Sequence, residues 1–369
     1  MISRSVKPDK MGSYKEEDVV FLLQDIGKYV LERNTEEREQ LIQAGTHYSE
    51  MLPVEYQPNE EYVALFHDTL HLYSKRLAVA VGLVAEQIKE KKSLEHLVIV
   101  SLARAGTPIG VLIKRYLSFK YSVDVPHYSI SIIRGRGIDE VAIDYIYRHH
   151  PQAAIQFVDG WTGKGAITSE LDEACQSYNS THINQLDSTL AVLADPGHCV
   201  EIFGTRDDFL IPSACLNSTV SGLVSRTVLN RRFMKPGELH GAKYYKELAE
   251  ADVSNLYVDT IEQEFPHIQE DIDQGLSELK NSDPTPTWKG LASVEWIQET
   301  FKISNRHFVK PGVGETTRVL LRRMPWKILI NPHFTNDLTH ILMLAKERHV
   351  PVEAFTEMTY SCCGLIKEL

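Results

Sequence analysis

The chain has 369 residues, more than one hydrophobic core usually serves, so we expect two or three domains. Apolar residues make up 43% of it and charged residues 24%, proportions typical of a soluble globular protein. The net charge is −11 but is uneven: from Trp288 onward there are 11 Lys and Arg against 8 Asp and Glu, and before it 28 against 42. This distribution indicates a basic C-terminal module on an acidic body.

Membrane and secreted classes are the first that the sequence excludes. The first 20 residues contain no apolar segment of the kind found in a secretory signal, and the apolar run 77–85 is far too short to span a bilayer. Five cysteines without a signal are typical of free thiols in a reducing compartment. We therefore expect a cytoplasmic protein with no membrane contact, and the sequence leaves its oligomeric state open.

The chain begins with helical periodicity and then changes rhythm. Apolar positions such as Val19, Leu22, Leu23 and Ile26 predict that residues 14–92 are mainly helical, so residues 1–92 are expected to form an N-terminal helical hood. Beyond them we expect strands at 96–101, 127–133, 153–158 and 188–195, and helices at 107–117, 139–150 and 166–175. This alternation is typical of a parallel sheet with helices on both faces, so residues 93–278 are predicted to be one α/β domain.

A polar segment with two prolines, "LKNSDPTPT", predicts a linker at 279–288. The last residues, 289–369, then form a compact unit with a strand–helix–strand–helix–strand pattern of its own.

The stretch "FVDGWTGKG", residues 157–165, combines a strand, an acidic residue, a glycine turn and a helix start. A glycine turn before a helix suits a phosphate, because backbone N–H groups and the helix dipole converge on one anion. It is not a P-loop, since Lys164 is followed by Gly165 rather than by Ser or Thr. Nor does "RGRGIDE" supply the third glycine of a dinucleotide loop, because Glu140 stands there.

An acid beside a phosphate cradle suits ribose 5-phosphate, whose hydroxyls can meet the carboxylate. At this point the chain resembles the type I phosphoribosyltransferases in three loops, "SLARAGTPIG", "SIIRGRGID" and "FVDGWTGKG". The resemblance implies a type I phosphoribosyltransferase-like fold. It also implies that Arg104 pairs with pyrophosphate, that Arg134 and Arg136 form a mobile lid, and that Asp159 grips the ribose and helps to hold Mg2+ with the pyrophosphate.

The resemblance also implies a set of substrate-binding residues around phosphoribosyl pyrophosphate and a base-like acceptor. They are Ala105, Gly106, Thr107, Gly160, Trp161, Thr162, Gly163, Lys164, Gly165, Asp195 and Arg206. Two departures stand out, because Gly160 replaces the usual second acid and Trp161 fills a position that is normally small or aliphatic. One carboxylate fewer weakens the grip on ribose or metal, so a non-catalytic regulator that senses phosphoribosyl pyrophosphate stays an alternative.

Longer runs resemble a narrower family, the StiP proteins of bacterial tellurite-resistance stress clusters. These runs include "GTHYSEMLP", "GTRDDFLIPSACLNSTVSGLVSRTV" and "YSCCGLI", and the likeness covers essentially the whole chain. It implies one of two activities, a phosphoribosyltransferase joined to a Pelota-like RNA-binding domain or a cysteine protease. For the second, Cys215 is the candidate nucleophile, with Ser213, Asn217 and Ser218 nearby, although a small core cysteine fits the same pattern.

The C-terminal unit resembles the Pelota and kink-turn-binding α/β fold. The likeness rests on the glycine turn "PGVGETTR" and on the later "VPV" strand, and it implies RNA contacts. The implied RNA-binding residues are Lys310, Gly314, Glu315, Thr316, Thr317, Arg318 and Arg322. The main expectation is thus a magnesium-dependent phosphoribosyltransferase of a stress response with an RNA-binding C-terminal domain; the alternatives are the Cys215 protease and the regulator.

Overall fold

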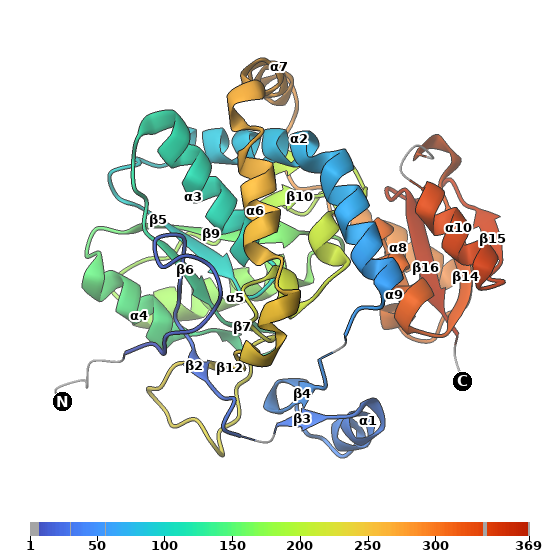
Figure 1. Ribbon diagram of the computed structural model, residues 1–369, viewed down its shortest axis with the longest axis horizontal. Helices are drawn as coiled ribbons and strands as arrows, with labels where there is room; N and C mark the ends of the chain where they lie inside the picture. The colour runs from blue at the N-terminus through green and yellow to red at the C-terminus, as the bar shows by residue number, and fades with distance from the viewer. Residues whose placement is uncertain (1–6, 30, 56, 335–337, 368–369) are drawn as a thin grey trace.

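The computed structural model describes residues 7–29, 31–55, 57–334 and 338–367. Two bodies stand side by side, a large α/β domain and a smaller C-terminal domain (Figure 1). Among the described residues, no helix is long and apolar enough to cross a membrane.

The large domain is built on a six-stranded sheet in the order β1-β6-β5-β9-β10-β11, in which every neighbouring pair is parallel. Its strands are β1 (Val20–Phe21), β5 (Leu97–Leu102), β6 (His127–Ile130), β9 (Ala154–Trp161), β10 (Leu190–Ala194) and β11 (Ile202–Thr205). The expected mixed α/β fold with a large parallel sheet is confirmed. The two edge strands were missed because they are too short to give a periodic pattern.

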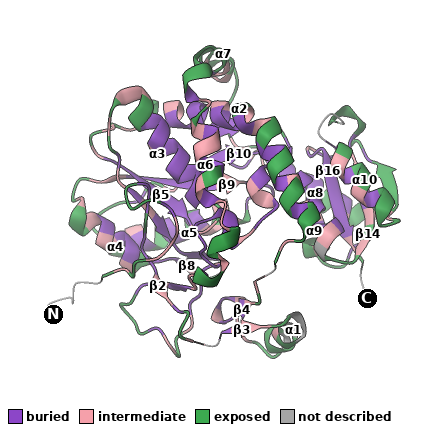
Figure 2. Ribbon diagram, in the orientation of Figure 1, coloured by how far each residue is buried: buried purple, intermediate pink, exposed green. Residues whose placement is uncertain are grey.

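Helices cover both faces of this sheet, as the alternation along β5 shows. Leu97 and Ile99 point into the core beneath α2 (Glu60–Lys91), α3 (Thr107–Tyr121) and α6 (Ser254–Glu262). Val98 and Val100 point into the opposite core, beneath α4 (Glu140–His149) and α5 (Ala166–Thr181). The central strands β5 and β10 are accordingly buried at every position, whereas the outer faces of the helices are exposed (Figure 2).

The N-terminal region is only partly the helical hood that the sequence predicts. Its first part is extended, with β1 joining the edge of the main sheet, and only the later part is a long helix, α2. The expectation of helix was wrong for the described residues between 14 and 34, which form turns and short strands, and around β1 burial alternates from residue to residue. Phe21 and Leu23 enter one core while Leu22 enters the other, as in a strand buried on both faces.

Smaller elements complete the large domain. Short two-stranded pairs join β2 (Gln24–Asp25) to β12 (Gly241–Ala242), β3 (Glu32–Arg33) to β4 (Leu52–Pro53), and β7 (Ile132–Ile133) to β8 (Gly137–Ile138). The remaining helices are α1 (Thr35–Gln43) and α7 (Gln269–Lys280), with 3-10 turns that include η2 (Pro212–Ala214) and η3 (Ser218–Val220).

The C-terminal domain contains a four-stranded sheet in the order β13-β16-β14-β15. Its elements are α8 (Lys289–Thr300), β13 (Val309–Pro311), α9 (Val313–Arg322), β14 (Pro325–Ile330), α10 (Thr339–Glu347), β15 (Val352–Ala354) and β16 (Cys362–Ile366). The predicted strand–helix pattern is present, but α8 and the central strand β16 were missed. β16 inserts antiparallel between β13 and β14, a long-range pairing that local periodicity cannot report.

The two domains are joined by hydrogen bonds across a continuous interface. The carboxylate of Asp208 accepts from the backbone N–H of Val313 at 2.9 Å and of Ser361 at 2.9 Å. The hydroxyl of Tyr360 donates to the carbonyl of Gly163 at 3.0 Å. The start of α9 therefore faces the carboxyl ends of the main strands.

Candidate functional site

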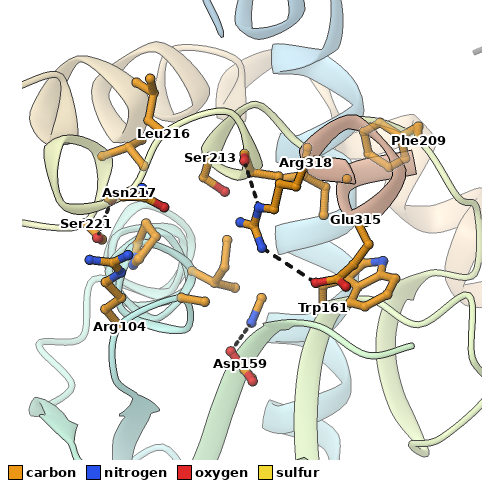
Figure 3. Close-up of a pocket in the computed structure, with 18 residues that line it drawn as sticks. Arg104, Asp159, Trp161, Phe209, Ser213, Leu216, Asn217, Ser221, Glu315 and Arg318 are labelled. Carbon is orange, nitrogen blue, oxygen red and sulfur yellow. Dashed lines mark hydrogen bonds and ion pairs between the residues drawn. The ribbon is translucent and has the colours of Figure 1, made fainter. Parts of the chain in front are cut away.

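A cavity of about 300 Å³ lies where the two domains meet the carboxyl edge of the sheet. The loop after β5 and the end of β9 form one side of it, the segment 209–221 a second, and the first turns of α9 a third (Figure 3). It is lined by Arg104, Ala105, Pro108, Ile109, Asp159, Gly160, Trp161, Phe209, Ile211, Ser213, Ala214, Leu216, Asn217, Val220, Ser221, Gly314, Glu315 and Arg318. We call this cavity the interdomain pocket.

Asp159 lies on the β9 side of the pocket, near the end of the strand. Its side chain is buried, with the residue 8% exposed, and its Oδ1 accepts a hydrogen bond from the N–H of Gly160 at 2.7 Å. Burial raises the pKa of the Asp159 carboxyl to about 7, against the weaker opposing effect of that hydrogen bond. The group can therefore take up or release a proton near neutral pH.

The two arginines that line the pocket already contact other protein groups. Arg104 Nη1 lies 3.4 Å from Glu55 Oε1 and 3.3 Å from the carbonyl of Val224. Arg318 lies 3.8 Å from Glu315, and its Nε donates to the carbonyl of Ala214 at 3.3 Å. Arg318 thus ties α9 to the segment 209–221.

Three predicted substrate residues, Ala105, Gly160 and Trp161, line the pocket together with Arg104 and Asp159, but the glycine turn does not open into it as expected. Gly165 has φ +73°, and a Cβ added there would meet the ring of Trp288, so the turn packs against the C-terminal domain. Lys164 Nζ donates to the carbonyl of Val309 at 2.9 Å. Burial, reinforced by the charge of Lys310, lowers the pKa of Lys164 to about 8. The turn that we expected to cradle a phosphate instead holds the neighbouring domain.

Five other predicted substrate residues do not line the pocket and make contacts within the large domain instead. Thr162 Oγ1 donates to Asp195 Oδ1 at 2.5 Å, and Arg206 Nε lies 3.9 Å from Asp195 Oδ2, so these groups brace the loop after β10. A Cβ on Gly106 would lie 2.4 Å from the carbonyl of Val158, which explains the glycine by close packing. Thr107 is buried at the start of α3.

The predicted lid arginines also lie away from the interdomain pocket. Arg136 forms an ion pair with Glu50 at 2.5 Å and donates to the carbonyl of Leu229 at 2.9 Å. Arg134 is exposed and lines a separate cavity together with Arg226. The three loops of the phosphoribosyltransferase resemblance therefore do not share one cavity.

All five cysteines are buried, and none forms a disulfide with another. Burial raises the pKa of Cys175, Cys199 and Cys363 to about 12 and that of Cys362 well above its ordinary value. These four thiols are therefore protonated and poor nucleophiles at neutral pH.

Cys215 has a different position, at the end of η2 within the segment 209–221. Its neighbours on both sides, Ala214 and Leu216, line the interdomain pocket, whereas its own side chain is fully buried in the main core.

The residues predicted to bind RNA lie in different surroundings in the structure. Gly314, Glu315 and Arg318 line the interdomain pocket, and Thr316 and Thr317 are buried. Although burial opposes it, Lys310 and Arg318 hold the pKa of Glu315 below its ordinary value, with Lys310 Nζ at 3.4 Å from the carboxylate. The side chain of Arg322 lies outside the described residues.

Many of the residues that line the pocket were not predicted from the sequence. Phe209, Ile211, Val220 and Ser221 come from a loop-rich stretch whose signals were its position after the fourth predicted strand and its likeness to the StiP proteins, neither of which assigns a role to these side chains. Pro108 and Ile109, in the first turn of α3, are indistinguishable from core residues by sequence.

A helix-covered parallel sheet, joined to a smaller α/β domain with a pocket at the carboxyl ends of its strands, defines a class of two-domain proteins. Residues 12–262 match the family described as "Tellurite-like stress resistance cysteine protease StiP", and residues 288–368 match the PELOTA RNA-binding domain. The chain is 33% identical to "Cysteine protease StiP" of Acinetobacter baylyi (strain ATCC 33305 / BD413 / ADP1), over 97% of this chain and 94% of the relative. The chain therefore belongs to the StiP family.

These findings correct the main functional prediction. Both the family description and the relative's name indicate a cysteine protease, so the predicted phosphoribosyltransferase activity was wrong, as was the partner phosphoribosyl pyrophosphate that depended on it. The alternative, a protease, is the better supported. Mg2+ was expected on Asp159 with pyrophosphate and stays an untested prediction. Among the described residues no group of three or more His, Cys, Asp or Glu could hold a metal ion.

Proposed function

We propose that the protein is a cysteine peptidase, that the interdomain pocket receives its substrate and that Cys215 is the nucleophile. The observation that carries this proposal is the position of Cys215 between two residues that line the pocket. Family membership supports the reaction class, because the Acinetobacter baylyi relative is named a cysteine protease and the chain aligns with 94% of its length.

The chemistry sets a requirement on the segment 209–221. A thiolate must reach the scissile carbonyl, whereas the Cys215 side chain is fully buried here. The segment therefore has to turn its thiol into the pocket before attack. The hydrogen bond from Arg318 to the carbonyl of Ala214 is the adjacent contact that such a turn would disturb.

The test is digestion of fluorescein-labelled casein by the full chain and by Cys215→Ser. We expect the variant to lose activity by roughly a hundredfold or more, the scale of losing a nucleophile. Cys175→Ser is the matched control, since it removes another buried thiol far from the pocket on α5 and should leave activity unchanged. Equal activity of Cys215→Ser and wild type would eliminate Cys215 as the nucleophile.

We also propose that the C-terminal domain binds RNA. The PELOTA RNA-binding match supports this, and so do the basic side chains around the start of α9, of which Arg318 is 42% exposed. Neutralising or reversing a phosphate-contacting lysine weakens binding of all sequences and reduces its salt dependence.

This second proposal is tested by filter binding of total tRNA to the full chain. Lys310→Glu should weaken binding about tenfold and flatten its dependence on salt. Lys327→Glu reverses a lysine on β14 of the same domain, paired with Glu353 at 2.6 Å, and should have a smaller effect. Equal losses in both variants would point to net charge rather than to a site at the start of α9.

A further inference from the structure

Of the four charged side chains that line the interdomain pocket, three lie within ion-pair distance of an opposite charge. The four are Arg104, Asp159, Glu315 and Arg318. Arg104 has Glu55 as its partner at 3.4 Å, and Arg318 has Glu315 at 3.8 Å. Asp159 accepts only the N–H of Gly160, and among the described residues no cation lies within ion-pair distance of it.

The surroundings of Asp159 make an incoming cation favourable. The carboxyl is buried, with the residue 8% exposed, and Ile109, Trp161 and Leu216 supply apolar walls of the same cavity. A buried carboxylate is costly unless it is paired, and burial accordingly raises its pKa to about 7. The indole of Trp161 adds an electron-rich ring, which also favours a cation.

We infer that the interdomain pocket binds a cationic group of its ligand, an amine, amidine or guanidinium, on the carboxylate of Asp159. The identity of the ligand as a peptide rests on the proposed peptidase function, and the substrate class is then peptides that present a Lys or Arg side chain. A neutral side chain of equal length fills the same volume but leaves the carboxyl without a partner, so it binds more weakly.

The test compares benzamidine with its neutral analogue benzamide by titration calorimetry on the full chain at pH 8. Benzamidine is expected to bind at least about tenfold more tightly, the scale of one charge-assisted hydrogen bond. Asp159→Asn keeps the shape of the side chain and removes its charge, so the variant should bind the two probes equally. A preference that persists in Asp159→Asn would overturn the inference.

The pH dependence provides a second readout in the same protein. Lowering the pH from 8 to 5.5 protonates the Asp159 carboxyl, so benzamidine affinity should fall while benzamide affinity stays constant. The other charged groups that face this carboxyl are Arg104 from the loop after β5 and Glu315 and Arg318 from α9. The pKa of Glu315 is lowered from its ordinary value of 4.5, so this carboxylate does not titrate in the interval.

A blocking variant locates the binding. Ala105 is exposed at the mouth of the pocket, so Ala105→Trp should exclude both probes without disturbing the core, and melting temperatures of all variants report on folding. Binding that survives Ala105→Trp, or failure of the wild type to distinguish the probes, would refute the inference.

Neither probe requires the thiol, so the two proposals fail separately. Cys215→Ser should keep the preference for benzamidine. If the wild type shows that preference but digests no casein, only the peptidase proposal is lost. If it digests casein through Cys215 but lacks the preference, only the cation site is lost.

Discussion

Asp159 lies near the end of a buried strand, and its carboxyl lines the interdomain pocket. Sequence reasoning assigned it to a ribose and a metal because it precedes a glycine turn. The structure separates it from that turn, which packs against Trp288 and Val309 instead. The chemistry of the residue is therefore set by its burial and by the pocket rather than by the neighbouring glycines.

The raised pKa of Asp159 gives a prediction for stability. Burial raises the folded pKa to about 7, above the ordinary value of 3.8, so the protonated form favours folding and this contribution is lost as the pH rises through 7. Relative to Asp159→Asn, the wild type should lose roughly 2–3 kcal/mol of unfolding free energy between pH 5 and pH 8. Urea denaturation of both proteins at the two pH values measures this. A wild type that gains stability relative to the variant would contradict it.

At the scale of elements, α3 is attached to two other segments by one arginine. Arg115 is 8% exposed and pairs with Asp18 before β1, and with Asp259 and Glu262 on α6, each at 2.6 Å. A buried charge that loses its partners is strongly destabilising, so this network fixes the N-terminal segment and α6 on α3.

Arg115→Met should therefore lower the unfolding free energy by roughly 3–5 kcal/mol, because it leaves the carboxylate of Asp18 buried without a cation. The neighbouring Lys114 pairs with an Asp124 whose side chain is 87% exposed, so Lys114→Met should cost less than about 1 kcal/mol. Urea denaturation of the two variants measures the difference. Similar losses in both would indicate that the network contributes no more than a surface ion pair.

At the scale of the whole molecule, the C-terminal domain completes the pocket. The side chain of Asp208 holds the start of α9 and the strand end at Ser361 through two backbone N–H groups. Gly314, Glu315 and Arg318, which the Pelota resemblance assigns to RNA, form a wall of the pocket as a result. The RNA binding proposed above would therefore compete with the pocket for the same side chains.

Removing that attachment should loosen the domains. Asp208→Ala is expected to let the domains move apart and to give the already exposed linker 279–288 more freedom to fit a protease, so limited trypsin digestion should separate the two domains at least several-fold faster than in the wild type. Asp207→Ala is the matched control, since Asp207 pairs with Arg76 on the surface and its side chain is 66% exposed. Unchanged digestion of Asp208→Ala would show that the domains are held by other contacts.

The same variant tests the competition with RNA. Releasing the start of α9 should strengthen binding of total tRNA by Asp208→Ala by a few-fold relative to wild type and to Asp207→Ala, because Arg318 becomes available. Filter binding at constant salt measures the change. Weaker binding by Asp208→Ala would mean that RNA binds to a surface that both domains form together.

Local regularities determined a large part of this fold. The strands β5, β9 and β10 and the helices between them were predicted because the hydrophobic period and the length of such elements can be recognised from neighbouring residues. Long shared runs also identified the family and the Pelota domain. The short edge strands, the extended N-terminal segment and the inserted β16 were missed because long-range pairing stabilises them.

Only the tertiary structure decided the site. Arg104, Asp159, the segment around Cys215 and the start of α9 are distant in sequence and meet through domain packing. The glycine turn illustrates why the sequence could not settle this. A turn free of side chains suits either an anion or a closely packed neighbouring backbone, and the choice depends on what the fold brings against it, here Trp288 and the carbonyl of Val309.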